Sequence, residues 1–568
     1  MRCCNNLYVG YINYYYIRKP VEVKSYKDFG SVEELLEYYS LKPKNLIKED
    51  KQEVEEISKD NDELTDAKNS NKYDVIYSDL KSTPTNIFKH IVVFTNDRDP
   101  KCNKTLKNIY EAVENLKKAK CDIIPKIHVF VAAKMEADED ESGIKIMDDH
   151  EEIYIKEESN IDTLIFSRLG VQGEDQCEHI VQLLQDRGFL VLNPVKYSAL
   201  ACDKYDSAIL FQKGGIPQPS FTLMTKSILY DEESYKNAMN DVFPEWDIKN
   251  PDKNKDFDCV VKILDGHGGT GVAVIDGKRL YAWLQLVFAV NPEQRLIIQK
   301  KEEADGGDIR VHVLTLREKQ VVLAAMKRVK IGGDFRSNVS LGASAEPVKL
   351  THEQEQIALK TAKLSKLPWC AVDIMPLVKG SNKEIGDNVV LEINASPGTA
   401  GISEVIGVNF INVLLNELND PTEFMLQDKI AGYIESVTLD FGEVSKQFLA
   451  KLDTGNSTKA STLEVGDYKD DGKKITFKID DKTLVFDKKG DMNAIAGDKS
   501  YKRPIIEIPM LTLGLRKAVK VPLAIVNHRD KKTTNLLLTR DILSKLGYVV
   551  HPNQAHILTK EMEKVNII

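Results

Sequence analysis

The sequence of 568 residues contains no run of about 18 apolar residues, so it predicts no membrane-spanning helix. Its amino-terminal segment lacks an apolar stretch of the secretory type, because asparagine, tyrosine and arginine interrupt it. The eight cysteines are scattered without a Cys-x-x-Cys pair, and none follows Cys370. This distribution argues against a disulfide framework or a zinc site. Together, these absences predict a cytoplasmic protein with reduced thiols.

An excess of positive charge is also absent. The chain has 78 lysine and arginine residues against 87 aspartate and glutamate residues, and this net charge of −9 argues against direct nucleic-acid binding. The composition, 42% hydrophobic and 29% charged, is typical of a folded globular protein. The chain is too long for one hydrophobic core, and its length predicts about three or four domains.

The first half of the chain changes character near residue 86. Residues 1–85 carry little periodic pattern and include the charged stretch 49–72, so we expect an N-terminal extension that is partly flexible. In residues 86–200, apolar runs alternate with helical spacing, which predicts an α/β domain with a small parallel sheet. Strands are expected at His90–Phe94, Ile127–Ala132 and Thr163–Phe166, and helices at Lys104–Lys118 and Cys177–Asp186. The acidic stretch 136–158 is expected to be an exposed loop.

A glycine-rich loop lies between two apolar runs, Cys259–Leu264 and Val272–Ile275. It contains Gly-x-Gly-x-x-Gly but opens a strand, and no lysine follows the last glycine, so neither a dinucleotide-binding fingerprint nor a Walker A loop fits. The remaining interpretation is a hairpin, with its second strand turning at Asp276-Gly277, whose backbone N–H groups cover phosphates beside the charge of Lys262. The glycines that would allow this close approach are Gly268, Gly269 and Gly271. The alternative is a glycine-rich surface hairpin.

A second pattern predicts a metal site. In the strand-like run Val389–Asn394, side chains alternate, so Glu392 and Asn394 share one face while apolar residues share the other. Upstream, the apolar run Ala371–Met375 contains one carboxylate, Asp373. If the two runs pair, two carboxylates and an amide converge as a hard cation such as Mg²⁺ requires. The alternative is a pair of edge strands with solvated acids.

Between these patterns, the run Asp308–Val313 alternates strictly, with an apolar odd-numbered face and a polar even-numbered face of Asp, Arg and His. Residues Ala324–Arg328 are the expected partner strand, and the polar run Gly333–Asn338 follows as a loop. Thr351, with glutamine three residues later, predicts a capped helix through Ser365.

In this order, the motifs resemble the ATP-grasp fold and, within it, the RimK-like glutamate ligases. The matching segments are Asp203-Lys204, Val261-Lys262 with the glycine loop, Asp308–Arg310, Asp334–Asn338, Ala371–Ile374 and Leu391–Gly398. The resemblance covers about residues 163–418. It implies a mixed α/β and α+β multidomain fold, with a pre-ATP-grasp α/β domain at 86–200 and an ATP-grasp ligase domain at 201–425.

The resemblance also implies the cofactors, the substrates and the roles of single residues. ATP and Mg²⁺ would be the cofactors, with Mn²⁺ as an alternative metal. An amino acid, typically glutamate, would be joined to the C-terminus of a protein or peptide, a ribosomal protein being one candidate. The implied ATP-binding residues are Lys204, Lys262, Gly268, Gly269, Gly271, Asp308, Arg336, Ser337 and Asn338, with Lys300 and Lys301 near the adenine. The implied catalytic cations are Arg328 and Arg336, and the implied metal ligands are Asp373, Glu392 and Asn394.

Residues 430–568 read differently, because short alternating strands replace the helical spacing and predict an all-β domain. An apolar strand ends in Asp453-Thr454-Gly455, and this segment together with Leu536–Asp541 resembles the retropepsin-like aspartic proteases, RimB-like proteins in particular. Proteases of this type use two aspartates that share a proton. With one Asp-Thr-Gly per chain, Asp453 would be catalytic only in a symmetric dimer, so a homo-oligomer is expected. The alternative is an inactive domain that binds a peptide or dimerises the ligase.

These features lead to one functional hypothesis and two alternatives. The hypothesis is an ATP- and Mg²⁺-dependent ligase that joins an amino acid to a C-terminal carboxylate through an acyl phosphate, with a retropepsin-like domain that trims or binds the product. One alternative is an ATP-grasp ligase of a free small acid. The other is a non-catalytic nucleotide-binding adaptor, suggested by Lys300 and Lys301 where the family has an acidic and an aromatic residue near the adenine.

Overall fold

A computed structural model describes residues 83–559, except for 141, 157–158, 169–174, 267–270, 318, 330–343, 380–383, 421–422, 425–428, 497–498 and 528–533. Most of the expected N-terminal extension therefore lies outside the described residues. So do five predicted ATP-binding residues, Gly268, Gly269, Arg336, Ser337 and Asn338. None of the helices in the described part of the chain has the length and apolar character needed to span a bilayer.

The N-terminal sheet has four parallel strands in the order β2-β1-β6-β7. They are β1 His90–Thr95, β2 Lys126–Val131, β6 Thr163–Arg168 and β7 Leu190–Leu192, and the helices beside them are α5 Lys104–Lys118 and α6 Asp175–Asp186. Their apolar runs are buried on both faces, as parallel strands require. The predicted parallel sheet is confirmed.

The prediction of a loop at residues 136–158 was wrong. The segment forms an antiparallel three-stranded sheet of β3 Glu136–Glu139, β4 Gly143–Met147 and β5 Glu152–Lys156. Ile144, Ile146 and Ile155 are fully or almost fully buried against the N-terminal sheet. The acidic composition hid this two-residue alternation, which is the stronger signal because it fixes which face is buried.

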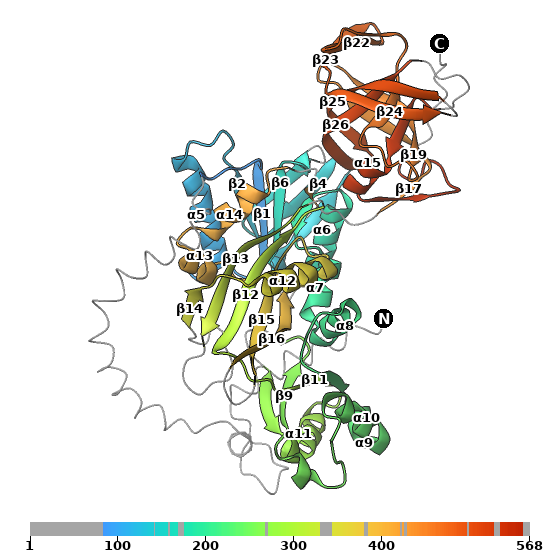
Figure 1. Cartoon of the computed structure of the whole chain (residues 1–568). Helices are drawn as coiled ribbons and strands as arrows, with labels where there is room; N and C mark the ends of the chain where they lie inside the picture. Colours follow the sequence, from blue (N-terminus) through green and yellow to red (C-terminus); the bar gives the residue numbers. More distant parts are fainter. Residues whose placement is uncertain are drawn as a thin grey trace.

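The small lobe is a four-stranded sheet in the order β10-β9-β11-β8, covered on one side by helices (Figure 1). Its elements are β8 Phe221–Met224, α9 Lys226–Tyr230, α10 Glu232–Val242, β9 Asp258–Ile263, β10 Val272–Asp276, α11 Gly277–Val290 and β11 Leu296–Lys300. The predicted hairpin of β9 and β10 is present. The turn predicted at Asp276-Gly277 is instead the start of α11, because the Asp276 carboxylate caps the helix by accepting from the Arg279 N–H.

The central sheet is antiparallel, in the order β14-β13-β12-β15-β16. Its strands are β12 Gly307–Thr315, β13 Gln320–Val329, β14 Ser344–Pro347, β15 Trp369–Lys379 and β16 Glu384–Asn394. One face packs against α7 Val195–Cys202, α8 Lys204–Gly214 and α12 His352–Ser365. The capping box predicted at Thr351 and Gln354 is confirmed.

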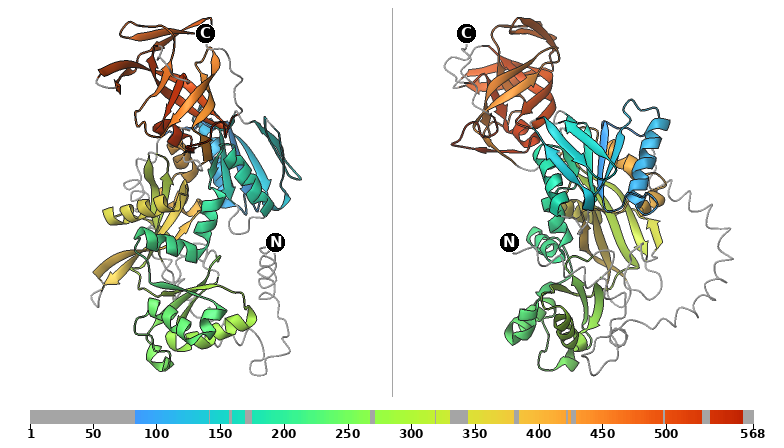
Figure 2. Two further views of the ribbon diagram at one scale, coloured as in Figure 1. Left: turned by 90° about the vertical axis from the view of Figure 1, so that its right-hand side faces the viewer. Right: turned by 180° about the vertical axis from the view of Figure 1, so that it is seen from behind.

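The opposite face of the central sheet shares one core with the N-terminal sheet. Apolar residues from both sheets meet α5, α13 Ala400–Ile406 and α14 Phe410–Glu417 in a single buried cluster. Figures 1 and 2 show these helices beside the two sheets. The polar end of the central sheet therefore lies close to the ends of the N-terminal strands.

The C-terminal part is a closed barrel of six strands in the order β18-β19-β27-β20-β26-β25, because β25 also pairs with β18. The strands are β18 Ile434–Asp440, β19 Ser445–Asp453, β20 Ser461–Glu464, β25 Lys499–Leu513, β26 Arg516–Val526 and β27 Leu536–Thr539, and α15 Arg540–Lys545 follows. Beyond the ring lie β21 Tyr468–Asp470, β22 Lys474–Ile479, β23 Lys482–Asp487 and β24 Gly490–Ala496. A separate parallel pair joins β17 Lys429–Gly432 to β28 Tyr548–His551. The predicted β-rich region is confirmed.

The barrel and the small lobe lie at opposite ends of the molecule (Figure 2). Polar bonds join the barrel to the rest of the described chain. Asn160 Nδ2 donates to the Leu515 carbonyl at 3.0 Å, and Arg317 Nη1 donates to the Asp541 carbonyl at 3.2 Å. These two bonds come from the turn between β5 and β6 and from the turn between β12 and β13.

Candidate functional site

A row of charged side chains crosses the polar face of the central sheet. The strand register places Arg310 of β12 opposite Asp373 of β15, and Asp373 opposite Glu392 of β16. On the other side, Asp308 of β12 lies opposite Arg328 of β13. The pairing of the two runs predicted to form a metal site is therefore confirmed, and the row continues onto two further strands.

Asp373 is the centre of this row. Its side chain is fully buried, and Arg310 donates to both carboxylate oxygens at 2.7 and 2.6 Å. Arg328 Nη2 donates to Oδ2 at 2.9 Å. Burial alone would raise the pKa of this carboxyl, but Arg310 and Arg328 outweigh burial and hold the pKa well below its usual range. Asp373 is therefore a carboxylate at neutral pH.

Arg328 is held from both sides. It is only 4% exposed and also donates from Nε to Asp308 Oδ1 at 2.5 Å. Burial disfavours its charge, but Asp373 and Asp308 outweigh burial and raise the pKa of the Arg328 guanidinium. The result is a rigid cation with a fixed orientation, the form in which arginine stabilises charge that develops on a reacting phosphate or carboxylate.

Glu392 and Asn394 complete the predicted metal-binding set. Asn394 Nδ2 lies 3.3 Å from Asp373 Oδ2 and 3.5 Å from Glu392 Oε1, and the Glu392 side chain is 37% exposed. Two carboxylates and an amide within this range suit a hard cation. Among the described residues, no group of three His, Cys, Asp or Glu side chains is arranged as a metal site. The set formed by Asp373, Glu392 and Asn394 contains only two residues of these types. In the described structure the Asn394 nitrogen faces the carboxylates and both Asp373 oxygens accept from arginines, so metal binding by this set remains a prediction.

Two lysines lie beside Glu392. Burial lowers the pKa of Lys262 to about 8, an effect that the charge of Glu392 partly offsets. Burial also lowers the pKa of Lys204, again offset by Glu392, and the Lys204 ammonium donates to the Gly266 carbonyl at the start of the glycine loop. Both lysines thus lie where the glycine loop leaves β9, as the predicted phosphate site requires.

Gly271 closes the described side of the glycine loop. It adopts φ +72°, and its carbonyl accepts from the Ile263 N–H at 2.9 Å. A Cβ atom at this position would lie 2.4 Å from the Ile263 side chain. The position therefore requires glycine for both its backbone conformation and its close packing.

Lys300 and Lys301, predicted near the adenine, are paired with acids. The Lys300 ammonium lies 3.5 Å from Glu302, and the Lys301 ammonium lies 2.7 Å from Asp258. The backbone N–H groups of both lysines already donate to carbonyls, those of Ser220 and Asp258. A base in this position would have to use the backbone carbonyls or displace these bonds, so their role in ATP binding stays a prediction.

Sequence reasoning missed Arg310 as a site residue. Arg310 makes the shortest contacts to Asp373 and lies 3.9 Å from Glu392. The signal was present, because the two-residue alternation already placed it on the same face as Asp308. Its partner could not be identified, since β12 and β15 are separated by more than fifty residues.

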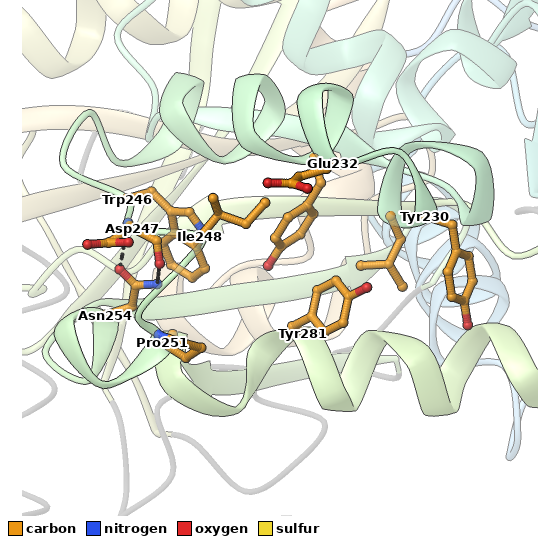
Figure 3. Close-up of a pocket in the computed structure, with 11 residues that line it drawn as sticks. Tyr230, Glu232, Trp246, Asp247, Ile248, Pro251, Asn254 and Tyr281 are labelled. Carbon is orange, nitrogen blue, oxygen red and sulfur yellow. Dashed lines mark hydrogen bonds between the residues drawn. The ribbon is translucent and has the colours of Figure 1, made fainter.

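A cavity of about 480 Å³ lies elsewhere in the small lobe, between α9, α10 and α11 (Figure 3). Tyr230, Tyr281 and Trp246 line it, together with the acids Glu232 and Asp247. None of the predicted ATP-binding or metal-binding residues lines this cavity. It is therefore distinct from the charged row on the central sheet.

Asp453 ends β19 inside the barrel, opposite Thr539 of β27. Its Oδ1 accepts from the Gly455 N–H at 3.1 Å, a turn in which the carboxylate and the glycine fix each other. Thr454 and Gly455 are exposed. The Asp-Thr-Gly loop is thus accessible. The catalytic pair of aspartates, one from each of two chains, stays a prediction.

Comparison with known protein families finds a match for the part of the chain that contains the small lobe and the central sheet. Residues 201–418 match the model of the RimK-like ATP-grasp domain. The chain therefore carries a RimK-like ATP-grasp domain, which contains the small lobe and the central sheet. The match stops before the barrel, whose family is unassigned.

Several curated relatives are named probable alpha-L-glutamate ligase. The chain is 38% identical to the one from Thioalkalivibrio sulfidiphilus over 150 residues, 26% of this chain and 46% of that relative. It is 34% identical to the one from Vibrio atlanticus over 171 residues, 29% of this chain and 53% of that relative. Against the one from Trichodesmium erythraeum, it is 29% identical over 247 residues, 43% of this chain and 73% of that relative. The chain thus spans about half the length of the first two relatives.

Two solved structures are among those found similar to this chain. The ATP-grasp ligase PsnB, solved with a minimal precursor, has 19% identity and a TM-score of 0.41, covering 59% of this chain and 98% of that one. D-alanyl-alanine synthetase A from Vibrio cholerae has 14% identity and a TM-score of 0.40, covering 58% of this chain and 99% of that one.

Proposed function

We propose that the protein is an ATP- and Mg²⁺-dependent ligase that joins an amino acid, glutamate being the first candidate, to the C-terminal carboxylate of a protein or peptide. The observation that supports this proposal is the buried row Asp308–Arg328–Asp373–Arg310 beside Glu392 and two lysines. The names of the curated relatives favour glutamate.

The chemistry needs an activated carboxylate, because a free carboxylate is a poor acyl donor. Transfer of the γ-phosphoryl group of ATP to a carboxylate oxygen releases ADP and forms an acyl phosphate. The amine of the incoming amino acid then attacks the acyl carbon, loses a proton and displaces phosphate. The protein has to position these groups and neutralise their charge.

Each of these tasks can be assigned to described residues. Lys204 and Lys262 would hold ATP phosphates, and Arg328 and Arg310 would face the negative charge that develops on the transferred group. Asp308 and Asp373 orient these guanidiniums through their hydrogen bonds. When bound, Mg²⁺ would neutralise phosphate charge, held by Asp373, Glu392 and Asn394. The glycine loop would cover the site and exclude water from the acyl phosphate.

The test is the release of ADP by the full chain, measured with and without amino acids and a candidate acceptor peptide. Glu392→Gln should nearly abolish ligation at limiting Mg²⁺, because it removes a charged metal ligand without changing shape. Glu355→Gln, on the first turn of α12 away from the row, is the matched control. Wild-type ligation by Glu392→Gln at limiting Mg²⁺ would contradict the metal assignment. ATP binding without ADP release under any of these conditions would instead favour the non-catalytic nucleotide-binding adaptor.

For the barrel, we propose a role on the product of the ligase, either trimming or binding the added tail. The support is the accessible Asp453 loop at the end of a strand. Cleavage would require two copies, because one aspartate cannot serve as both acid and base. A binding module is the alternative, and a time course on an extended peptide distinguishes the two.

A further inference from the structure

A partly buried arginine with no carboxylate partner among the described residues lies next to the charged row. Arg168 is the last residue of β6, and its guanidinium stacks 5.7 Å from the centre of the Trp369 ring on the central sheet. Its Nη1 atom is inaccessible to solvent and has no hydrogen-bond partner among the described residues. Its Nη2 atom reaches only the Thr105 hydroxyl, at 3.4 Å.

The electrostatics of Arg168 differ from those of Arg310 and Arg328. Burial lowers the pKa of Arg168 to about 10, and no described carboxylate offsets the effect. A buried guanidinium is costly unless an anion pairs with it, and its planar fork suits a carboxylate in two-point contact. The Arg168 guanidinium therefore lacks a paired anion, because none of the described residues supplies one.

The Trp369 ring that Arg168 contacts also stacks on His312, with 6.4 Å between the ring centres. His312 is fully buried with no partner for either ring nitrogen, and the Nε1 atom of Trp369 is also unpartnered among the described residues. Burial lowers the pKa of His312 to about 3, so the ring is neutral and keeps one N–H donor. These groups could serve a polar ligand together with Arg168.

The fold places Arg168 where ligands bind in open parallel sheets. In the order β2-β1-β6-β7, the chain crosses from one side of β1 to the other, and the crevice lies at the carboxyl ends of β1 and β6. Arg168 is at that end, opposite Thr95 in register, and Thr105 belongs to the first turn of α5. This helix N-terminus adds a favourable field for an anion.

The same crevice adjoins the end of β16. The Ser396 hydroxyl donates to the carbonyl of Ser167, the neighbour of Arg168, at 3.3 Å. Ser396 follows the predicted metal ligand Asn394 by two residues. Arg168 is therefore linked through Ser167 and Ser396 to the end of the strand that carries Glu392 and Asn394.

We propose that Arg168, with His312 and the N-terminus of α5, forms a subsite that binds a carboxylate of a substrate during ligation. The carboxylate is one that does not react: the α-carboxylate of the incoming amino acid, or a side-chain carboxylate of the acceptor peptide. This inference rests on the proposed ligase function, whereas binding of an anion at Arg168 can be tested without it.

The kinetic test compares Arg168→Met and Arg168→Lys with wild type in the full chain. We expect the KM for the amino acid or for the acceptor to rise about 10- to 100-fold, because a charge-assisted contact is lost. The substrate whose KM changes identifies the source of the carboxylate, and the KM for ATP should stay constant. Arg187→Met is the matched control, since Arg187 pairs with Glu139 at 2.9 Å away from the crevice.

A second readout separates binding from a structural role. Removing an unpaired buried charge should leave the melting temperature unchanged or raise it, whereas a structural arginine would lower it. Saturating glutarate, a dicarboxylate probe, should raise the melting temperature of wild type and Arg187→Met but not of Arg168→Met. If Arg168→Met does not fold, Arg168→Lys carries both comparisons.

Three results would overturn the subsite: no glutarate effect on wild type, an equal effect on the Arg168 variants, or a change confined to the KM for ATP. Failure of the ligase function is recognised separately. In that case, wild type shows no ADP release stimulated by an amino acid, while the glutarate difference still reports on Arg168.

Discussion

Replacing Asp373 with asparagine tests whether the charged row holds the central sheet together. The side chain is fully buried and accepts three bonds from two guanidiniums. Removing one partner of a buried ion pair typically costs about 3–5 kcal/mol, because the other charge is left uncompensated. Here Arg328 keeps Asp308, and Arg310 is 15% exposed and keeps Glu392 at 3.9 Å. We therefore expect the lower end, about 3 kcal/mol.

The assay must report on this sheet alone, since a chain with several folded parts does not unfold in one step. Native-state hydrogen exchange of the β12 and β15 amides gives the local free energy of opening. Glu139→Gln is the control, because the Arg187–Glu139 pair has a half-exposed carboxylate and should contribute at most about 1 kcal/mol.

The pH dependence has a defined sign. The pKa of Asp373 is lower in the folded than in the unfolded state, so its contribution is complete above the unfolded value, about 3.9, and is lost as the pH falls below it. The difference between wild type and Asp373→Asn should therefore be constant from pH 8 to about pH 5 and shrink at lower pH. Wild-type opening energies in Asp373→Asn, or a difference that vanishes by pH 6, would refute the reasoning.

Three further predictions follow from single residues. The affinity of wild type for ATP should fall as the pH rises through about 8, since Lys262 then loses its charge; calorimetric titrations should show a flat profile for Lys262→Met, and a flat wild-type profile would contradict the assignment. Gly271→Ala should raise the KM for ATP several-fold, because the added Cβ meets Ile263, whereas Gly407→Ala has the same positive φ, lies in open space and should not. Asp453→Asn should stop trimming of an extended peptide and leave ATP-dependent ligation intact; equal trimming by both proteins, or trimming by a strict monomer, would leave the barrel as a binding module.

The sequence predicted the parts of the site whose signal is local. The alternation in β12 and β16 identified the polar face, and Thr351 with Gln354 identified the start of α12. These features depend on neighbours within one element, which a sequence displays directly. The strand pairing of Asp373 with Glu392 was a hypothesis that only the register could decide.

The features that were missed depend on longer-range contacts or on competing local signals. Arg168 was missed because it contacts Trp369, two hundred residues away, and because its place at a crevice depends on the order of the N-terminal strands. The strands in 136–156 were hidden by acidic residues around buried isoleucines. Asp276 supports a turn and a helix cap equally well, and the apolar spacing of α11 decided the outcome.

The parallel pairing of β17 with β28 brings the first and last strands of the barrel region side by side, with Lys429 opposite Tyr548 and Gly432 opposite His551. A segment whose ends meet can be inserted into, or removed from, a host chain without stretching either one. The barrel region thus has the topology of a transferable module, because its entry strand and its exit strand lie at the same place.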